Sequence, residues 1–187
     1  VGLLVCFGVI PPDAVKGLAF AGELGLDGSI RRVPGIAPMV GVRADDDWVV
    51  PADAVAEARV AAKGAIRPVS GLVALIEALT GIAPWPEHER GSLSSLLVAP
   101  AMHDLADVKG QPHRRRALEV PAAGAHHLLL VGPPGAGKTM LARRLAGLLP
   151  DLQPETAVET TMIHSAAGAQ LPAGGLVVRP PFRAPHH

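Results

Sequence analysis

The chain has 187 residues, of which 49% are hydrophobic and only 3% aromatic, and it contains no tyrosine. This length fits one or two domains with a core built from Ala, Val, Leu and Ile. Lys and Arg number 17, as do Asp and Glu, so no overall charge favours a nucleic-acid or membrane partner. Ring-shaped motors that bind DNA nevertheless concentrate charge on a few loops, so DNA binding is not excluded.

The start of the chain and its single cysteine bear on location. Cys6 cannot form an intramolecular disulfide, which fits a reducing cytoplasm, and we expect it to be a small buried residue. Val1–Ile10 is apolar but lacks a charged leader, so no signal peptide is predicted. No apolar run reaches the length of a membrane span, so no membrane partner is expected. The missing initiator Met and the ending at His187 predict a fragment cut at both ends.

The first part of the chain alternates predicted strands and helices. A hairpin is predicted from strands Leu18–Gly25 and Ser29–Val33 around an Asp27-Gly28 turn. The other predicted elements are a helix over Ile36–Arg43, a strand over Trp48–Val50, and helices over Ala52–Ala61 and Gly71–Leu79, the last capped by Ser70 and ended by Gly81. This alternation indicates a small α/β domain over residues 1–81.

A linker is predicted over residues 82–102, which contain Pro84, Pro86 and a Gly-Ser stretch. A second domain is predicted over residues 103–187. Its expected elements are a helix over Gln111–Ala123 that Pro121 should distort or end, a buried parallel strand over His126–Val131, a helix over Lys138–Leu149, and a helix from Pro154 to about Ala167 before the loop Gly168–Gly175.

The chemistry is concentrated in the sequence GPPGAGKT, a GxxxxGK[ST] phosphate-binding loop or P-loop. An apolar strand before it and a helix after it raise the weight of the motif. The predicted nucleotide-binding residues are Gly132, Pro133, Pro134, Gly135, Ala136, Gly137, Lys138 and Thr139. The glycines let backbone amides surround phosphate oxygens, Lys138 supplies a positive charge, and the Thr139 hydroxyl is a Mg²⁺ ligand. The predicted cofactors are ATP, with GTP less favoured, and Mg²⁺.

Hydrolysis requires more than this loop. An ATPase motor normally holds magnesium and activates water with an acidic pair at the end of a second apolar strand. The acidic residues after Thr139 are Asp151, Glu155 and Glu159, which lie on or near predicted helices. The chain is therefore predicted to bind nucleotide without completing a catalytic site.

The segment HDLADVKGQPHRRRALEVPAAGAHHLLLVGPPGAGKTMLARRLAGLLPDL resembles the magnesium-chelatase-like AAA+ ATPases of the YifB/ComM type. So do ETTMIHSAAG at Glu159–Gly168 and RPPFRAPHH at Arg179–His187. The resemblance implies a parallel-sheet AAA+ core, of which this chain holds the first part, and self-association into a hexameric ring. It also implies that Asp107–Gln111 lines the adenine pocket. For the paired His186-His187, a structural or inter-subunit role is preferred over metal binding.

The stretch GLAFAGELGLDGSIRRVPG at Gly17–Gly35 resembles the Lon-protease-like N-terminal domain of these proteins. The fold class is therefore α/β, a partial Lon-like domain followed by the start of an AAA+ core. The segment Val33–Met39 carries no lysine where Lon has its catalytic one, and neither Lys16 nor Lys63 takes that place. Protease activity is disfavoured because a serine without its base is a weak nucleophile.

Three functions remain open at this point. The first is a DNA-remodelling, branch-migrating ATPase of the ComM type, the second a magnesium-chelatase motor subunit for metal insertion, and the third a truncated nucleotide-binding fragment without activity. The basic residues His113–Arg116 and Arg143-Arg144 are interpreted as solvated charges, the first group close to the nucleotide or the next subunit and the second offsetting Asp151 and Glu155.

Overall fold

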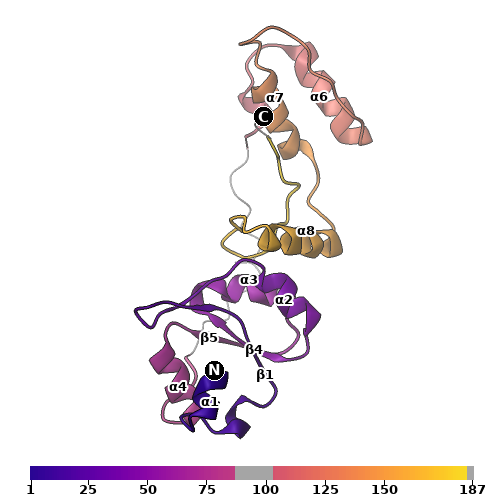
Figure 1. Cartoon of the computed structure of the whole chain (residues 1–187). Coiled ribbons are helices and arrows are strands. Elements are labelled where there is room, and N and C mark those ends of the chain that lie inside the picture. The colour runs from indigo at the N-terminus through magenta and orange to yellow at the C-terminus, as the bar shows by residue number, and fades with distance from the viewer. Residues whose placement is uncertain (87–102, 185–187) are drawn as a thin grey trace. The chain divides into compact units, whose positions relative to one another are not determined.

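The structure, a computed structural model, describes residues 1–86 and 103–184 and divides into two compact units (Figure 1). The N-terminal unit comprises Val1–Val98 and Val158–Leu176, and the P-loop unit comprises Ala99–Ala157 and Val177–His187. The predicted linker lies largely outside the described residues, and the predicted domain boundaries stay predictions. The segment Val158–Leu176, which the sequence places in the second domain, is packed within the N-terminal unit.

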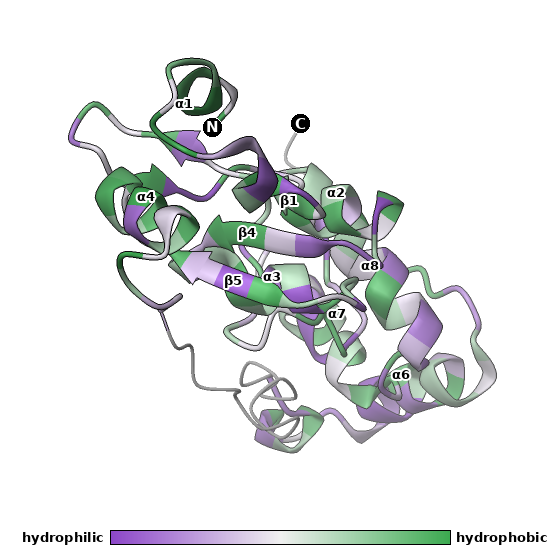
Figure 2. Cartoon of the chain, turned by 90° about the horizontal axis from the view of Figure 1, so that it is seen from below, coloured by the Kyte–Doolittle hydropathy of each residue, from purple (hydrophilic) through white to green (hydrophobic). Residues whose placement is uncertain are grey.

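The centre of the N-terminal unit is a three-stranded parallel sheet in the order β1-β4-β5. Its strands are β1 (Leu18–Phe20), β4 (Asp47–Pro51) and β5 (Ile66–Val69). The central strand β4, predicted from its apolar run, becomes hydrophobic towards its end, where its residues are buried (Figure 2). Strand β5 was not predicted from the sequence, because Arg67 and Pro68 break its apolar pattern; an edge strand tolerates proline.

Helices cover both faces of this sheet (Figure 1). Alternate residues of β4 point to opposite faces, so Val50 contributes to one apolar cluster and Val49 to the other. The first cluster includes Ile36 and Val55 from α2 (Ile36–Val42) and α3 (Val55–Arg59). The second cluster is covered by α1 (Gly2–Cys6), η1 (Pro12–Val15) and α4 (Leu72–Thr80). The α/β fold class is thus confirmed for this unit.

The predicted strand Leu18–Gly25 is wrong as a single element. It divides into β1, which joins the parallel sheet, and β2 (Glu23–Leu24), which pairs with β3 (Ile30–Arg31) as an antiparallel hairpin. Gly22 lies between them at φ 151°, and a Cβ there would come within 3.0 Å of Ile30. Gly22 therefore separates the two strands, because few other residues adopt this backbone conformation and Ile30 leaves no room for a side chain. The predicted hairpin turn itself is present.

Most helix predictions for this unit are confirmed, and the start of α3, the cap of α4 and the burial of Cys6 are corrected. Residues Ala52–Ala54 form η2 and continue into α3, and α4 ends at Gly81 in the left-handed conformation. Ser70 does not cap α4, because the N-cap position falls on Gly71. Cys6 is exposed rather than buried, because α1 is a short helix that buries none of its residues.

The P-loop unit contains η3 (Leu105–Asp107), α6 (Pro112–Gly124), α7 (Lys138–Leu148) and the start of α8 (Pro154–Ala166). Its core consists of Leu105, Val108, Leu118 and Leu141. Pro121 lies in the last turn of α6 and does not end it. Among the described residues, no helix is long and apolar enough to cross a membrane.

The buried strand predicted over His126–Val131 is wrong for this chain. These residues form no strand, and Leu129 and Val131 are each 85% exposed. A strand is stabilised by a neighbouring strand, and the described part of the P-loop unit contains none. The apolar run alone therefore did not decide the secondary structure.

Candidate functional site

The predicted phosphate-binding loop runs directly into helix α7. Two of its glycines, Gly135 and Gly137, have φ of 78° and 81°, a region that other residues rarely adopt. Gly137 is the N-cap of α7 and has no side chain to bind the first backbone amides of the helix. Those amides, together with the positive end of the helix dipole, are suited to bind an anion.

In the structure, the ammonium group of Lys138 is hydrogen-bonded to carbonyl oxygens of the loop itself. Its Nζ donates hydrogen bonds to the carbonyl oxygens of Gly132 at 2.7 Å and Pro133 at 2.8 Å. Pro134–Met140 line an open pocket of about 370 Å³, which includes the exposed Thr139. A Cβ added at Gly135 would meet no atom within 4 Å, so the loop surface is open there. The arrangement fits a phosphate group, which would replace the two carbonyls as the partner of the ammonium.

The start of α6 contacts the same loop. Arg114 Nη1 donates to the carbonyl of Ala136 at 2.9 Å and to Gln111 Oε1 at 3.0 Å. Gln111 itself has φ 53°, an uncommon backbone conformation for a residue with a side chain. Arg116 is exposed and pairs with Glu119. Arg114 and Arg116 are thus both exposed, as expected for solvated charges, and Arg114 in addition hydrogen-bonds the predicted nucleotide-binding loop.

Arg144 on α7 does not have the role predicted for it. Its side chain is only 13% exposed, donates to the carbonyl of Asp104 at 2.9 Å and lies 3.7 Å from Asp107. Asp104 in turn caps η3 through the amide of Ala106. Arg144 thus links η3 to α7, the helix that follows the P-loop. The contact joins residues forty positions apart, which the sequence did not indicate.

The acidic residues after the P-loop are not among the residues that line the pocket of Pro134–Met140. Asp151 pairs with Arg179 at 3.5 Å, and Glu155 and Glu159 are exposed on α8. No cluster of three or more His, Cys, Asp or Glu side chains that could hold a metal occurs within residues 1–86 and 103–184. His186 and His187 lie outside the described residues.

Comparisons with known proteins place these features in a family. Residues 104–187 match the family described as "Magnesium chelatase, subunit ChlI". The chain is 44% identical over 185 residues to protein Rv2897c of Mycobacterium tuberculosis, covering 95% of this chain and 35% of that protein. It is 37% identical over its whole length to YifB of Salmonella typhimurium and 33% identical to the competence protein ComM of Haemophilus influenzae, covering 37% of each. The chain therefore spans about a third of the length of these relatives.

A shorter similarity concerns another class of protein. Over 43 residues, 23% of the chain, it is 46% identical to an archaeal Lon protease of Archaeoglobus fulgidus. The match covers too little of either chain to establish a Lon-like domain.

Proposed function

This chain belongs to the magnesium-chelatase-like proteins of the YifB/ComM type, and we propose that it binds ATP and Mg²⁺ at Gly132–Thr139 as the first part of an AAA+ ATPase core. The observation that carries the proposal is the P-loop geometry. An uncapped helix start, two glycines at positive φ and the ammonium of Lys138 meet around one open pocket. The N-terminal unit is proposed to be a Lon-like domain without protease activity.

Each residue of the site has a separate task in this proposal. The loop amides and Lys138 hold the phosphates, and Thr139 contributes a hydroxyl towards the metal. Bound Mg²⁺ would neutralise charge on the phosphate oxygens. Arg114 positions the loop through the carbonyl of Ala136. The acidic groups that activate water are proposed to lie elsewhere in the full-length protein.

For the full-length protein, we propose a ring-forming motor, a hexamer, that remodels DNA. The support is the similarity to a protein named for competence, ComM. A motor subunit for metal insertion is the second candidate, favoured by the match to the magnesium chelatase family. ATP turnover by the full-length protein should rise with single-stranded or branched DNA. ATP turnover that does not change with DNA but requires chelatase partner subunits would favour the second candidate instead.

The binding proposal is tested by Lys138→Ala in the present chain. Loss of a charge-assisted contact to phosphate predicts about 10- to 100-fold weaker ATP binding in the presence of Mg²⁺, measured by calorimetry. Arg143→Ala is the matched control, because it removes one positive charge from an exposed position of the same helix. Equal ATP affinity for Lys138→Ala and the parent chain would overturn the proposal.

A further inference from the structure

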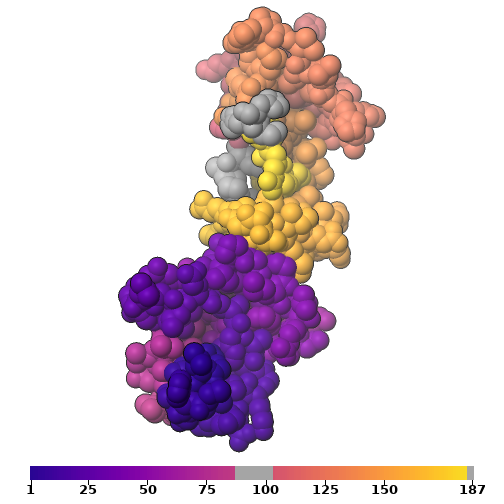
Figure 3. Space-filling model, in the orientation of Figure 1, coloured from indigo at the N-terminus to yellow at the C-terminus, as the bar shows by residue number. Residues whose placement is uncertain are grey.

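The segment Val158–Leu176 belongs to the family match over residues 104–187 but is packed within the N-terminal unit. It consists of most of α8 and the loop that follows. The chain therefore passes between the two units three times, after Val98, after Ala157 and after Leu176. In the space-filling view, this gold segment lies on the atoms of α2 and α3 (Figure 3).

A buried serine is the centre of the contact. Ser165 on α8 is fully buried, and its Oγ donates a hydrogen bond to Glu57 Oε1 on α3. Its carbonyl oxygen accepts from the amide of Gly35 at 2.9 Å. The amide of Ala37, at the start of α2, lies 3.3 Å from Ser165 Oγ and 3.4 Å from Glu57 Oε1. One side chain of the segment thus joins both helices.

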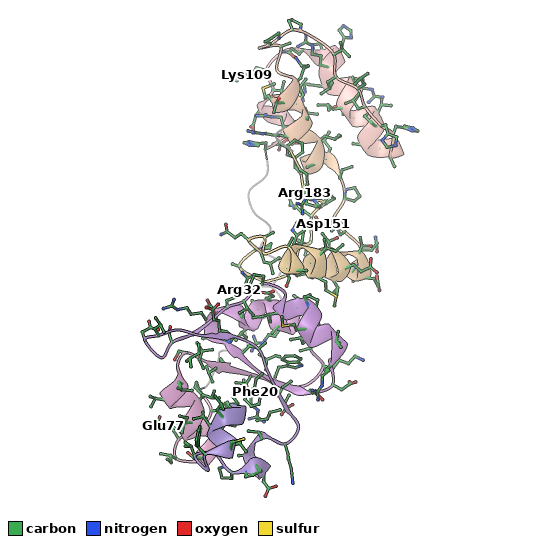
Figure 4. The ribbon with its side chains drawn as sticks, in the orientation of Figure 1. Phe20, Arg32, Glu77, Lys109, Asp151 and Arg183 are labelled. Atoms are coloured by element: carbon green, nitrogen blue, oxygen red, sulfur yellow. The ribbon has the colours of Figure 1, made fainter. Side chains whose placement is uncertain are left out.

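The carboxylate that receives this serine is itself buried. Glu57 is 3% exposed, and its second oxygen, Oε2, accepts from Arg32 Nε at 2.6 Å. Arg32 lies on the side of the N-terminal unit that faces the segment (Figure 4). Burying a carboxylate away from water costs free energy unless each of its oxygens accepts a hydrogen bond. Without the segment, Glu57 would lose one of its two side-chain partners.

Close steric contacts add a second, independent kind of specificity. A Cβ at Gly41 of α2 would lie 2.9 Å from the terminal methyl of Met162, so the two residues are in contact. Gly175 has φ 80° and passes so close to the carbonyl of Ala56 that a Cβ would overlap with it. Gly168 packs beside Pro34 with a corresponding distance of 3.6 Å. The segment is therefore matched to this surface in shape as well as in polarity.

We propose that Val158–Leu176 is a docking segment that completes the fold of the N-terminal unit, with Glu57 and Ser165 as the pair that determines its specificity. The N-terminal unit is then joined to the P-loop unit through the chain at both ends of this segment, as well as through residues 87–102. The partner that the α2–α3 surface fits is a helix of the same chain that presents a buried serine.

The test is to cut the folded chain. A protease recognition sequence inserted within residues 87–102 allows cleavage into one piece with Glu57 and another with Ser165. The pieces share no disulfide, since the chain has a single cysteine. We expect them to co-elute in size-exclusion chromatography after cleavage. Separation of the parent pieces would overturn the proposal.

Two variants of different kinds sharpen the experiment. Ser165→Ala removes the donor to a buried carboxylate and should weaken the association of the pieces about 10- to 100-fold. Gly175→Ala leaves the polar pair intact but introduces a side chain against Ala56, and should also weaken the association of the pieces.

Two exposed positions provide controls, Thr156→Ala on α8 and Glu23→Gln in β2. Pieces that carry either substitution should associate like the parent pieces. Tryptophan fluorescence of the piece that contains Trp48 and Glu57 verifies that this piece is folded. Parent-like association in both Ser165→Ala and Gly175→Ala would contradict the proposal.

Discussion

The N-terminal unit and the P-loop unit use their apolar strands differently. In the N-terminal unit, β4 is buried between β1 and β5 and covered by helices on both faces. In the P-loop unit, the apolar run His126–Val131 has no strand neighbour among the described residues, and its side chains are largely exposed. An apolar run therefore becomes a strand only where another strand supplies its backbone partners.

The largest effects are expected from truncating each core in turn. Ile36 and Leu118 are both fully buried, so Ile36→Ala and Leu118→Ala should each destabilise by about 2–5 kcal/mol. Both tryptophans, Trp48 and Trp85, lie in the N-terminal unit. In urea unfolding, Ile36→Ala should lower the fluorescence midpoint, and Leu118→Ala should affect the helical circular dichroism signal more than fluorescence.

The exposed Val131 provides the control for this pair. Val131→Ala should change the unfolding free energy by less than about 0.5 kcal/mol, because its side chain is already in water. If Leu118→Ala lowered the fluorescence midpoint as much as Ile36→Ala, the two units would unfold as one, and the contrast between them would be lost. A large effect of Val131→Ala would show that the run is buried after all.

A smaller effect is expected within the P-loop unit from two adjacent arginines. Arg144→Ala removes a largely buried cation that bonds the Asp104 carbonyl and should cost about 1.5 kcal/mol. Arg143→Ala, at the neighbouring exposed position, should be nearly neutral. Thermal unfolding followed by circular dichroism compares the two. Equal melting temperatures of the two variants would mean that the contacts of Arg144 with η3 do not stabilise the P-loop unit.

The smallest effect concerns the exposed hairpin of the N-terminal unit. The hydroxyl and amide of Ser29, helped by Arg31, lower the pKa of Asp27 from 3.8 to about 2. A carboxyl with a depressed folded-state pKa stabilises the fold above pH 3.8, and this contribution disappears as the pH falls towards 2. Asp27→Asn should therefore lower the melting temperature slightly at pH 6 and leave it unchanged near pH 2. A parent-like melting temperature at both pH values would contradict the assigned hydrogen bonds.

Local signals made much of the chain predictable. The helices α2, α7 and α8 were predicted within a residue or two, α7 from its apolar spacing and α8 from Pro154 in its first turn, and the turn residues Asp27-Gly28 predicted the hairpin. The glycine spacing before Lys138 predicted a loop that the structure places at the start of a helix. These features depend on residues close together in the sequence, and such residues carry their own conformational preferences.

Neighbouring residues specified the GxxxxGK[ST] loop sequence and the bounds of α2, α7 and α8, because these features depend on local preferences. The folded structure alone established that β1 pairs with β4, that Leu129 and Val131 remain exposed, and that Arg144 bonds the carbonyl of Asp104. It also decided that Ser165 meets Glu57 across more than a hundred residues. Strand pairing and the burial of polar groups depend on partners distant in the chain, and no local pattern specifies which partner will be met.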